Sequence, residues 1–176
     1  MDVRRILVLG GATLAAGCVP AARTPPQQPP QQLPAQQPVP PPPPTPQDWR
    51  DMPLSPGGWV YSNQGASTQA LFGTANGAAA FIVRCDRPRR QVFLSREGTP
   101  SAAMLTIRTS NAARNLPASI QREPMAYVSA AVAASDPILD SIAFSRGRFT
   151  VEAPGLPMLV IPAWPEPARV VEDCRG

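Results

Sequence analysis

The chain has 176 residues, of which 43% are hydrophobic and 25 are proline, and its formal net charge is +4. It contains no histidine, and all 16 of its basic residues are arginines. This composition excludes a histidine general base, a Ser-His-Asp or Cys-His nucleophile, a histidine-ligated metal, a lysine Schiff base and a P-loop phosphate clamp.

The N-terminal segment has the layout of a bacterial lipoprotein signal. Two arginines precede an apolar run of about 11 residues (6–16), which is too short to span a bilayer as a helix. The run leads into Leu14-Ala15-Ala16-Gly17-Cys18, which resembles a lipobox, although Ala15 stands where leucine is preferred. We therefore predict a signal peptide over residues 1–17 and lipidation of Cys18.

An ordinary secretory signal cut after Ala21 or Ala22 is the alternative, and it would discard Cys18. Val19 follows the cysteine where aspartate would retain a lipoprotein in the inner membrane. The prediction is a lipid-anchored protein of the cell envelope, in the outer membrane and facing the periplasm.

Residues 20–47 are almost entirely Pro, Gln, Ala and Thr, with five consecutive prolines at 40–44. Proline fixes φ and removes a backbone donor, so this composition favours polyproline II over helix or sheet. We predict that residues 18–47 are the lipidated cysteine and a disordered Pro/Gln-rich stalk. A ligand for a proline-recognising domain and a tether through the cell wall are the alternatives to a plain spacer.

Short strand-like runs with turn residues between them occupy residues 48–176, which we predict to be a single disulfide-closed β domain. The expected fold is mainly β, a small antiparallel sandwich or barrel with one or two short helices, including a C-terminal helix. The strand predictions, in chain order, are 59–61, 69–72, 81–85, 92–94, 104–108, 125–133, 149–152 and 158–161.

Turn and cap residues support this reading. Asn76-Gly77 predicts a hairpin turn, and Pro154-Gly155 predicts another. Asp136 is the expected N-cap of a short helix over residues 137–140, with proline at its first position. A last helix should carry Val170, Val171 and Cys174 on one face.

The three cysteines resolve into one lipid site and one pair. With Cys18 lipidated, Cys85 and Cys174 remain, and two thiols of an exported domain usually pair. The alternative, a redox-active pair, lacks the C-x-x-C spacing that makes one sulfur reactive. We predict a structural disulfide that attaches the C-terminal tail to a strand.

Arginines gather in two places that are candidates for an anion patch. The first surrounds the expected turn after the strand at 81–85, and the second flanks Gly147, where a bulge or a positive φ is expected. The alternative is solvated turns whose arginines pair with nearby acids. The candidate residues are Arg84, Arg87, Arg89, Arg90, Arg146 and Arg148, and Arg96 lies near the first group.

Three segments resemble a family of uncharacterised exported proteins of sphingomonad-type bacteria: Phe81–Asp86, Ala143–Phe149 and Arg169–Arg175. The resemblance covers most of residues 57–176 and implies no activity. In layout alone, the chain is also similar to invasion-associated locus B-like proteins and lipoprotein lysozyme inhibitors, whose functional motifs it does not match.

We therefore expect a non-catalytic envelope lipoprotein with a binding or scaffolding domain and no cofactor. Its expected partners are the membrane, through the lipid, and an envelope protein or cell-wall component, and not nucleic acid. An inhibitor of a lysozyme-type cell-wall hydrolase is the alternative. A small carboxylate-dependent hydrolase is a third reading, because two acids suffice for glycoside hydrolysis. We expect Trp49, Trp59 and Trp164 to be core or edge anchors.

Overall fold

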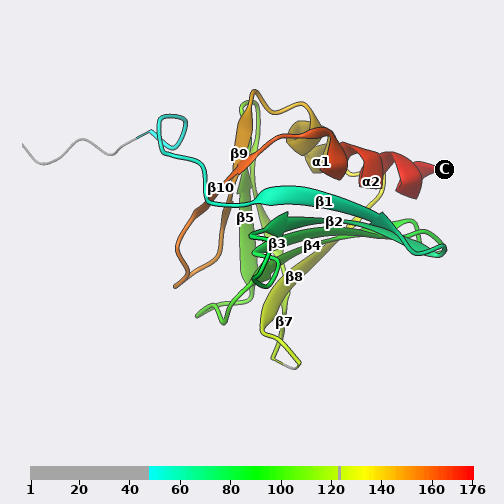
Figure 1. Ribbon diagram of the computed structural model, residues 1–176, viewed down its shortest axis with the longest axis horizontal. Helices are drawn as coiled ribbons and strands as arrows, with labels where there is room; N and C mark the ends of the chain where they lie inside the picture. Colours follow the sequence, from blue (N-terminus) through cyan, green and yellow to red (C-terminus); the bar gives the residue numbers. More distant parts are fainter. Residues whose placement is uncertain (1–47, 123) are drawn as a thin grey trace, which may run out of the picture. The chain divides into compact units, whose positions relative to one another are not determined.

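Two antiparallel sheets and two helices share one hydrophobic core in the computed structural model, which describes residues 48–122 and 124–176 (Figure 1). Neither sheet closes into a barrel in this part of the chain. The predicted signal peptide, Cys18 and the proline-rich stalk lie outside the described residues. No helix between residues 48 and 176, apart from the undescribed position 123, is long and apolar enough to cross a membrane.

The larger sheet has six strands in the order β1-β2-β3-β4-β8-β7. Its first four strands are consecutive antiparallel neighbours, and β8 then pairs with β4. The strands are β1 (Gly58–Asn63), β2 (Ser67–Gly73), β3 (Phe81–Asp86), β4 (Gln91–Glu97), β7 (Ser119–Gln121) and β8 (Tyr127–Ala133).

The smaller sheet has four strands in the order β10-β9-β5-β6. The chain enters it after β4 and again after the first helix. Its strands are β5 (Met104–Arg108), β6 (Ala113–Pro117), β9 (Arg148–Glu152) and β10 (Leu159–Pro162).

The helices are α1 (Pro137–Ala143) and α2 (Pro165–Arg175). Asp136 caps α1 as predicted, because its carboxylate accepts the Ile138 N–H at 2.9 Å. The predicted inward face of α2 is also confirmed, since Val170, Val171 and Cys174 are all buried. α2 lies against β1 to β4, on the core side of the larger sheet.

The predicted disulfide is present between Cys85 of β3 and Cys174 of α2, whose Cα atoms are 5.6 Å apart. The alternation along β3 explains how this bond reaches the helix. Phe81, Val83 and Cys85 are buried toward the core, whereas Ile82 and Arg84 are partly exposed on the other face.

Some local predictions need correction. β6 and β7 were not predicted, because β6 lacks β-branched residues and ends in proline, and β7 has three residues with only Ile120 apolar. β8 begins at Tyr127, two residues later than expected.

The Asn76-Gly77 pair lies in the β2–β3 connection, but it does not form the tight turn that the pair predicts. Gly77 does not adopt a positive φ, and its N–H instead closes a turn on the Thr74 carbonyl at 3.1 Å. A Cβ at Gly77 would lie 2.8 Å from the Thr74 hydroxyl, so close approach explains this glycine. The Pro154-Gly155 turn is confirmed, with Gly155 at φ +82°.

Candidate functional site

The candidate arginines lie in three separate places. Arg84 projects from the outer face of β3, and Arg87, Arg89 and Arg90 lie in the β3–β4 turn. Arg146 and Arg148 line a hollow beside Trp49 and Arg50. Each group therefore has to be judged by its own partners.

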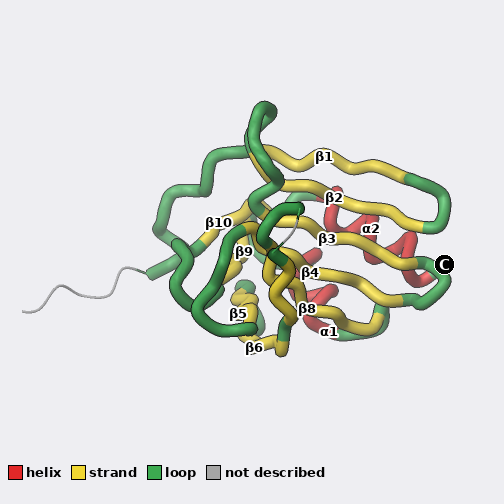
Figure 2. The backbone as a smooth tube through the Cα atoms, turned by 90° about the horizontal axis from the view of Figure 1, so that it is seen from below, coloured by secondary structure: helices red, strands yellow, loops and turns green. Residues whose placement is uncertain are grey.

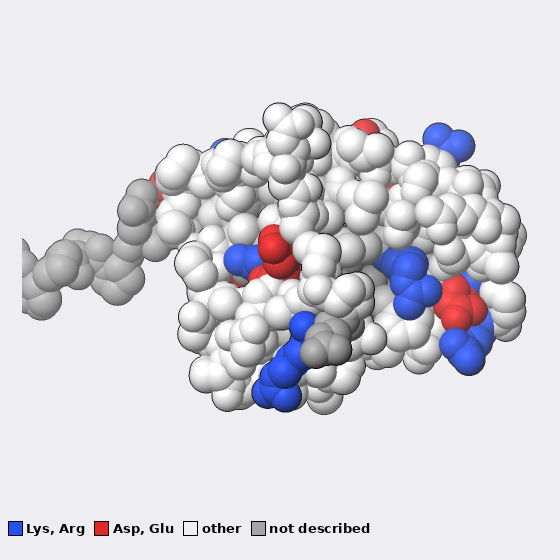
Figure 3. Space-filling view, turned by 60° about the horizontal axis from the view of Figure 1, so that its bottom comes forward, with Lys and Arg blue, Asp and Glu red and all other residues white. Residues whose placement is uncertain are grey.

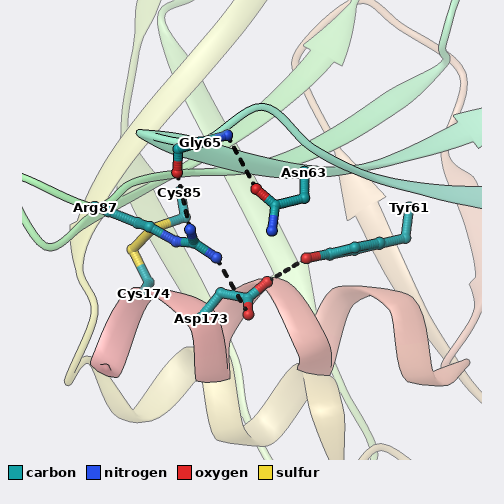
Figure 4. Close-up of polar contacts among 7 residues, drawn as sticks. All are labelled: Tyr61, Asn63, Gly65, Cys85, Arg87, Asp173 and Cys174. Carbon is teal, nitrogen blue, oxygen red and sulfur yellow. Dashed lines mark hydrogen bonds and ion pairs between the residues drawn. A yellow bond between two sulfur atoms is a disulfide. The ribbon is translucent and has the colours of Figure 1, made fainter.

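The turn arginines are engaged with acceptors of the domain itself. The Arg87 guanidinium lies 3.4 Å from the Asp173 carboxylate and donates to the Gly65 carbonyl at 2.8 Å (Figure 4). Arg89 pairs with Asp86 at 3.0 Å, and Arg90 donates to the Arg175 carbonyl at 2.5 Å. Arg87 and Arg90 thereby hold the C-terminal helix near the disulfide, whereas Arg89 is engaged within its own turn.

Tyr61 belongs to the same cluster. Its hydroxyl donates to the Asp173 carboxylate at 2.6 Å, and this hydrogen bond raises the pKa of Tyr61. The Arg169 guanidinium lies 4.2 Å from the centre of the Tyr61 ring. Asp173 is thus shared by a tyrosine and an arginine, and we assign this cluster to the attachment of α2.

Arg96 is buried and does not belong to a surface patch. Its guanidinium donates to the carbonyls of Ala80, Glu97 and Pro157 at 2.5 to 3.5 Å, and burial lowers its pKa. It joins three backbone segments where the sheets meet.

The outer face of the six-stranded sheet is open. In Figure 2, which views the domain from below, β1, β2, β3, β4 and β8 lie side by side with both helices behind them. Figure 3 brings this underside forward and shows that most of its surface is uncharged. The β7–β8 hairpin projects on this side of the sheet (Figure 1).

A groove of about 260 Å³ crosses this face. We call it the sheet-face groove. It is lined by Gln69, Ile82, Arg84, Phe93, Ser95, Ser119, Gln121, Tyr127, Ser129 and Ala131, and none of these side chains is a carboxylate.

The strand register arranges the groove in two rows of cross-strand neighbours. The first row contains Gln69, Arg84, Phe93 and Ala131, which are paired in that order across β2, β3, β4 and β8. The second row contains Ile82, Ser95, Ser129 and Ser119, and the Ser95 and Ser129 hydroxyls are 2.8 Å apart. The row that contains Arg84 therefore runs beside a row that contains three serine hydroxyls.

Arg84 is the charged group of the sheet-face groove. Its guanidinium carbon lies 4.4 Å from the centre of the Phe93 ring. Stacking occupies the face of the guanidinium and leaves its in-plane N–H donors free. The Arg84 side chain has no hydrogen bond or ion pair with any of the described residues.

The tryptophans follow the expectation only in part. Trp59 is buried, and its indole N–H donates to the Pro162 carbonyl at 2.9 Å. Trp164 is half exposed beside Gly58, and Trp49 stacks with Arg50 at 4.8 Å. Trp59 is the core anchor, whereas Trp49 lines a surface hollow.

Sequence reasoning identified Arg84 but missed the rest of the groove. Gln69, Tyr127 and Ser129 carry no motif, and only the folded sheet brings them into one groove with Arg84. The sequence signal for this face is the period-two alternation along β3, which places Arg84 on the face opposite to the buried Val83 and Cys85 side chains. Residues 48–122 and 124–176 contain no group of three or more His, Cys, Asp or Glu residues that could hold a metal.

Comparison with known proteins adds no residue roles, because no family model, curated protein or solved structure matches the chain. The resemblances stated from the sequence therefore stay predictions. The candidate sites rest on the geometry of this domain.

Proposed function

We propose that the protein is a non-catalytic, lipid-anchored binding protein of the bacterial cell envelope, and that its sheet-face groove holds a carboxylate of a cell-wall component. One observation carries the proposal. The Arg84 guanidinium is stacked on Phe93 in an open groove, where no carboxylate of residues 48–122 or 124–176 occupies its donors.

The ligand chemistry follows from these donors. Guanidinium and carboxylate match in geometry, and a bidentate pair forms two charge-assisted hydrogen bonds. Gln69, beside Arg84 in the first row, and the serine row supply neutral partners for amide or hydroxyl groups. The peptide stems and sugars of a cell wall together carry carboxylate, amide and hydroxyl groups.

The size of the groove supports recognition of one unit of a polymer. Its volume of about 260 Å³ is just below the range of about 300–1,000 Å³ that is usual for small-molecule pockets. One amino acid or one sugar ring fits this space, and the remainder of the polymer would run along the open sheet.

The envelope location is supported by two independent features. The Cys85–Cys174 bond suits an oxidising compartment outside the cytoplasm. The N-terminal pattern predicts export, lipidation of Cys18 and a proline-rich stalk. Together they favour a binding domain held away from the membrane and facing the periplasm.

Replacing Arg84 tests the groove. Arg84→Gln removes the charge and the fork of donors, so its affinity for purified cell-wall sacculi should fall about 10- to 100-fold. Co-sedimentation of the full chain carrying Cys18→Ala measures this binding without a lipid. Arg84→Lys should recover only part of the affinity, because lysine lacks the bidentate fork.

Arg122→Gln is the matched control, since Arg122 is exposed outside the groove and its replacement removes the same charge. Amidation blocks the carboxyl groups of sacculi. The protein with an unchanged groove should bind amidated sacculi as weakly as the Arg84→Gln variant binds untreated sacculi. Equal binding by the Arg84 and Arg122 variants, or no effect of amidation, would contradict the proposed ligand.

Replacing Cys18 tests the anchor. In cell fractionation, Cys18→Ala should move the protein from the membrane fraction to the soluble fraction, because no acylated cysteine remains. The Cys85→Ala/Cys174→Ala variant removes the other two cysteines and should stay with the membrane. Unchanged fractionation of Cys18→Ala would overturn the lipoprotein assignment.

A further inference from the structure

A second hollow, which shares no residue with the sheet-face groove, gathers three arginines. It has a volume of about 290 Å³ and is lined by Trp49, Arg50, Ser110, Arg146 and Arg148. We call it the arginine hollow. Its residues come from the start of the domain, from the β5–β6 connection, from the segment between α1 and β9, and from the first residue of β9.

Two serines hold the segment that carries Arg146 and Arg148. The buried Ser145 hydroxyl donates to the Arg148 carbonyl at 2.5 Å and accepts the Ser110 N–H at 3.0 Å. The Ser110 hydroxyl in turn accepts the Arg146 N–H at 3.1 Å. Gly147 has the predicted positive φ, +74°, which lets the chain reverse between the two arginines.

The positive charge of the hollow is incompletely neutralised. Arg50 pairs with Asp48 at 3.3 Å, and the Arg50 backbone N–H lowers the pKa of Asp48. Arg148 donates to the Met52 carbonyl at 2.5 Å, which carries no net charge. The Arg146 side chain has no acceptor within residues 48–122 and 124–176.

Among the described residues, no acid forms an ion pair with Arg146 or Arg148. Glu152 of β9, the strand that begins at Arg148, pairs with Arg108 at 3.5 Å. Like charges that line one hollow repel each other, and an anion between them would remove this cost.

We propose that the arginine hollow binds a phosphate group, carried either by a phospholipid headgroup or by a soluble phosphate ester. A phosphate presents several strong acceptor oxygens, which three guanidinium groups can approach from different sides. A carboxylate has two oxygens and therefore offers fewer acceptor sites to three guanidinium groups than a phosphate does. The indole of Trp49 adds an apolar wall for the group esterified to the phosphate.

One nearby feature separates the two sources of phosphate. Phe144, two residues before Arg146, is 78% exposed. An exposed aromatic ring close in sequence to cationic residues suits the headgroup region of a bilayer, whereas binding of a soluble ester does not require it.

The experiment uses the full chain with Cys18→Ala. Glycerol 3-phosphate is titrated by calorimetry, and co-sedimentation is measured with phosphatidylcholine vesicles with and without phosphatidylglycerol. Arg146→Gln should weaken binding about five- to tenfold for whichever probe is the ligand. The variant should fold normally, because the exposed Arg146 side chain makes no hydrogen bond or ion pair with residues 48–122 or 124–176.

Controls distinguish the sources and the two sites. Arg122→Gln removes the same charge elsewhere and should leave binding unchanged. Phe144→Ala should weaken binding to phosphatidylglycerol vesicles if the ligand is a headgroup, and should leave glycerol 3-phosphate binding intact if it is a soluble ester. Arg84→Gln should weaken binding to sacculi and leave binding to the phosphate probes unchanged. The failure of either proposal can therefore be seen separately.

The proposal is overturned if neither probe binds, or if Arg122→Gln lowers binding as much as Arg146→Gln. In the latter case the attraction would come from net charge and not from the hollow.

Discussion

Breaking the Cys85–Cys174 bond is expected to lower the free energy of unfolding by about 4 kcal/mol. The two cysteines are 89 residues apart, so the bond removes much of the loop-closure entropy of the unfolded chain. Both residues are buried, and the bond joins a central strand to the last helix. Urea denaturation of the oxidised and the reduced chain measures the difference.

The effect should be concentrated at the C-terminus. α2 has 11 residues, which is marginal for an isolated helix, and its stability depends on attachment to the sheet. Reduction should therefore increase hydrogen exchange in α2 before it does so in β3.

The Cys85→Ala/Cys174→Ala variant provides the control, because it cannot reform the bond and should match the reduced chain. Intact mass should change by two hydrogens on reduction. Identical urea midpoints for the oxidised and reduced chains would refute the stabilising role.

Phe81→Ala is expected to cost about 3–5 kcal/mol of unfolding free energy. Phe81 is fully buried on β3, and its ring contacts Trp59 and Phe149 in edge-on arrangements at 6.3 and 6.1 Å. Since Phe149 belongs to the smaller sheet, Phe81 joins the two sheets through aromatic contacts. Its removal leaves a cavity where the sheets meet, and urea denaturation measures the loss.

Phe93→Ala is the matched control on the opposite face of the same sheet. Phe93 is only partly buried and supports Arg84 in the sheet-face groove. Its replacement should cost much less stability and should weaken sacculus binding. A cost equal to that of Phe81→Ala would mean that the outer face is not an open surface.

The two proposed sites are suited to different anions of the cell envelope. One guanidinium on an aromatic ring, beside amide and hydroxyl groups, suits a carboxylate of a polymer. Three guanidinium groups around one hollow suit a phosphate. Because the sites share no residue, a protein with both would contact cell wall and membrane independently, and the Arg84 and Arg146 variants separate these contacts.

Local patterns predicted much of the fold. The alternation in β3 identified its buried face, Asp136 and its proline identified the start of α1, and spacing identified the inward face of α2. These features depend on residues within one turn or one strand, so they can be read without tertiary contacts. β6 and β7 were missed because their pairing with β5 and β8 determines their conformation, and their own residues do not favour it.

The arginines mark the limit of this reasoning. In sequence, Arg84, Arg87, Arg89 and Arg90 form one cluster, but the sheet turns Arg84 to the outer face. The other three meet acceptors from Gly65, Asp86 and the C-terminal helix. Most of these acceptors are distant in sequence, so which arginine stays free depends on the folded chain.

The sequence by itself determined the mainly β class, the partners of the disulfide and the faces of the principal strands and helices, because each follows from composition or from local periodicity. Only the tertiary structure decided which guanidinium groups are free to bind an anion. Strand register places Arg84 on Phe93, and chain reversal at Gly147 places Arg146 and Arg148 beside Trp49, almost 100 residues earlier. The physical reason is that a guanidinium is neutralised by whatever acceptor lies within a few ångströms, and folding determines that neighbour.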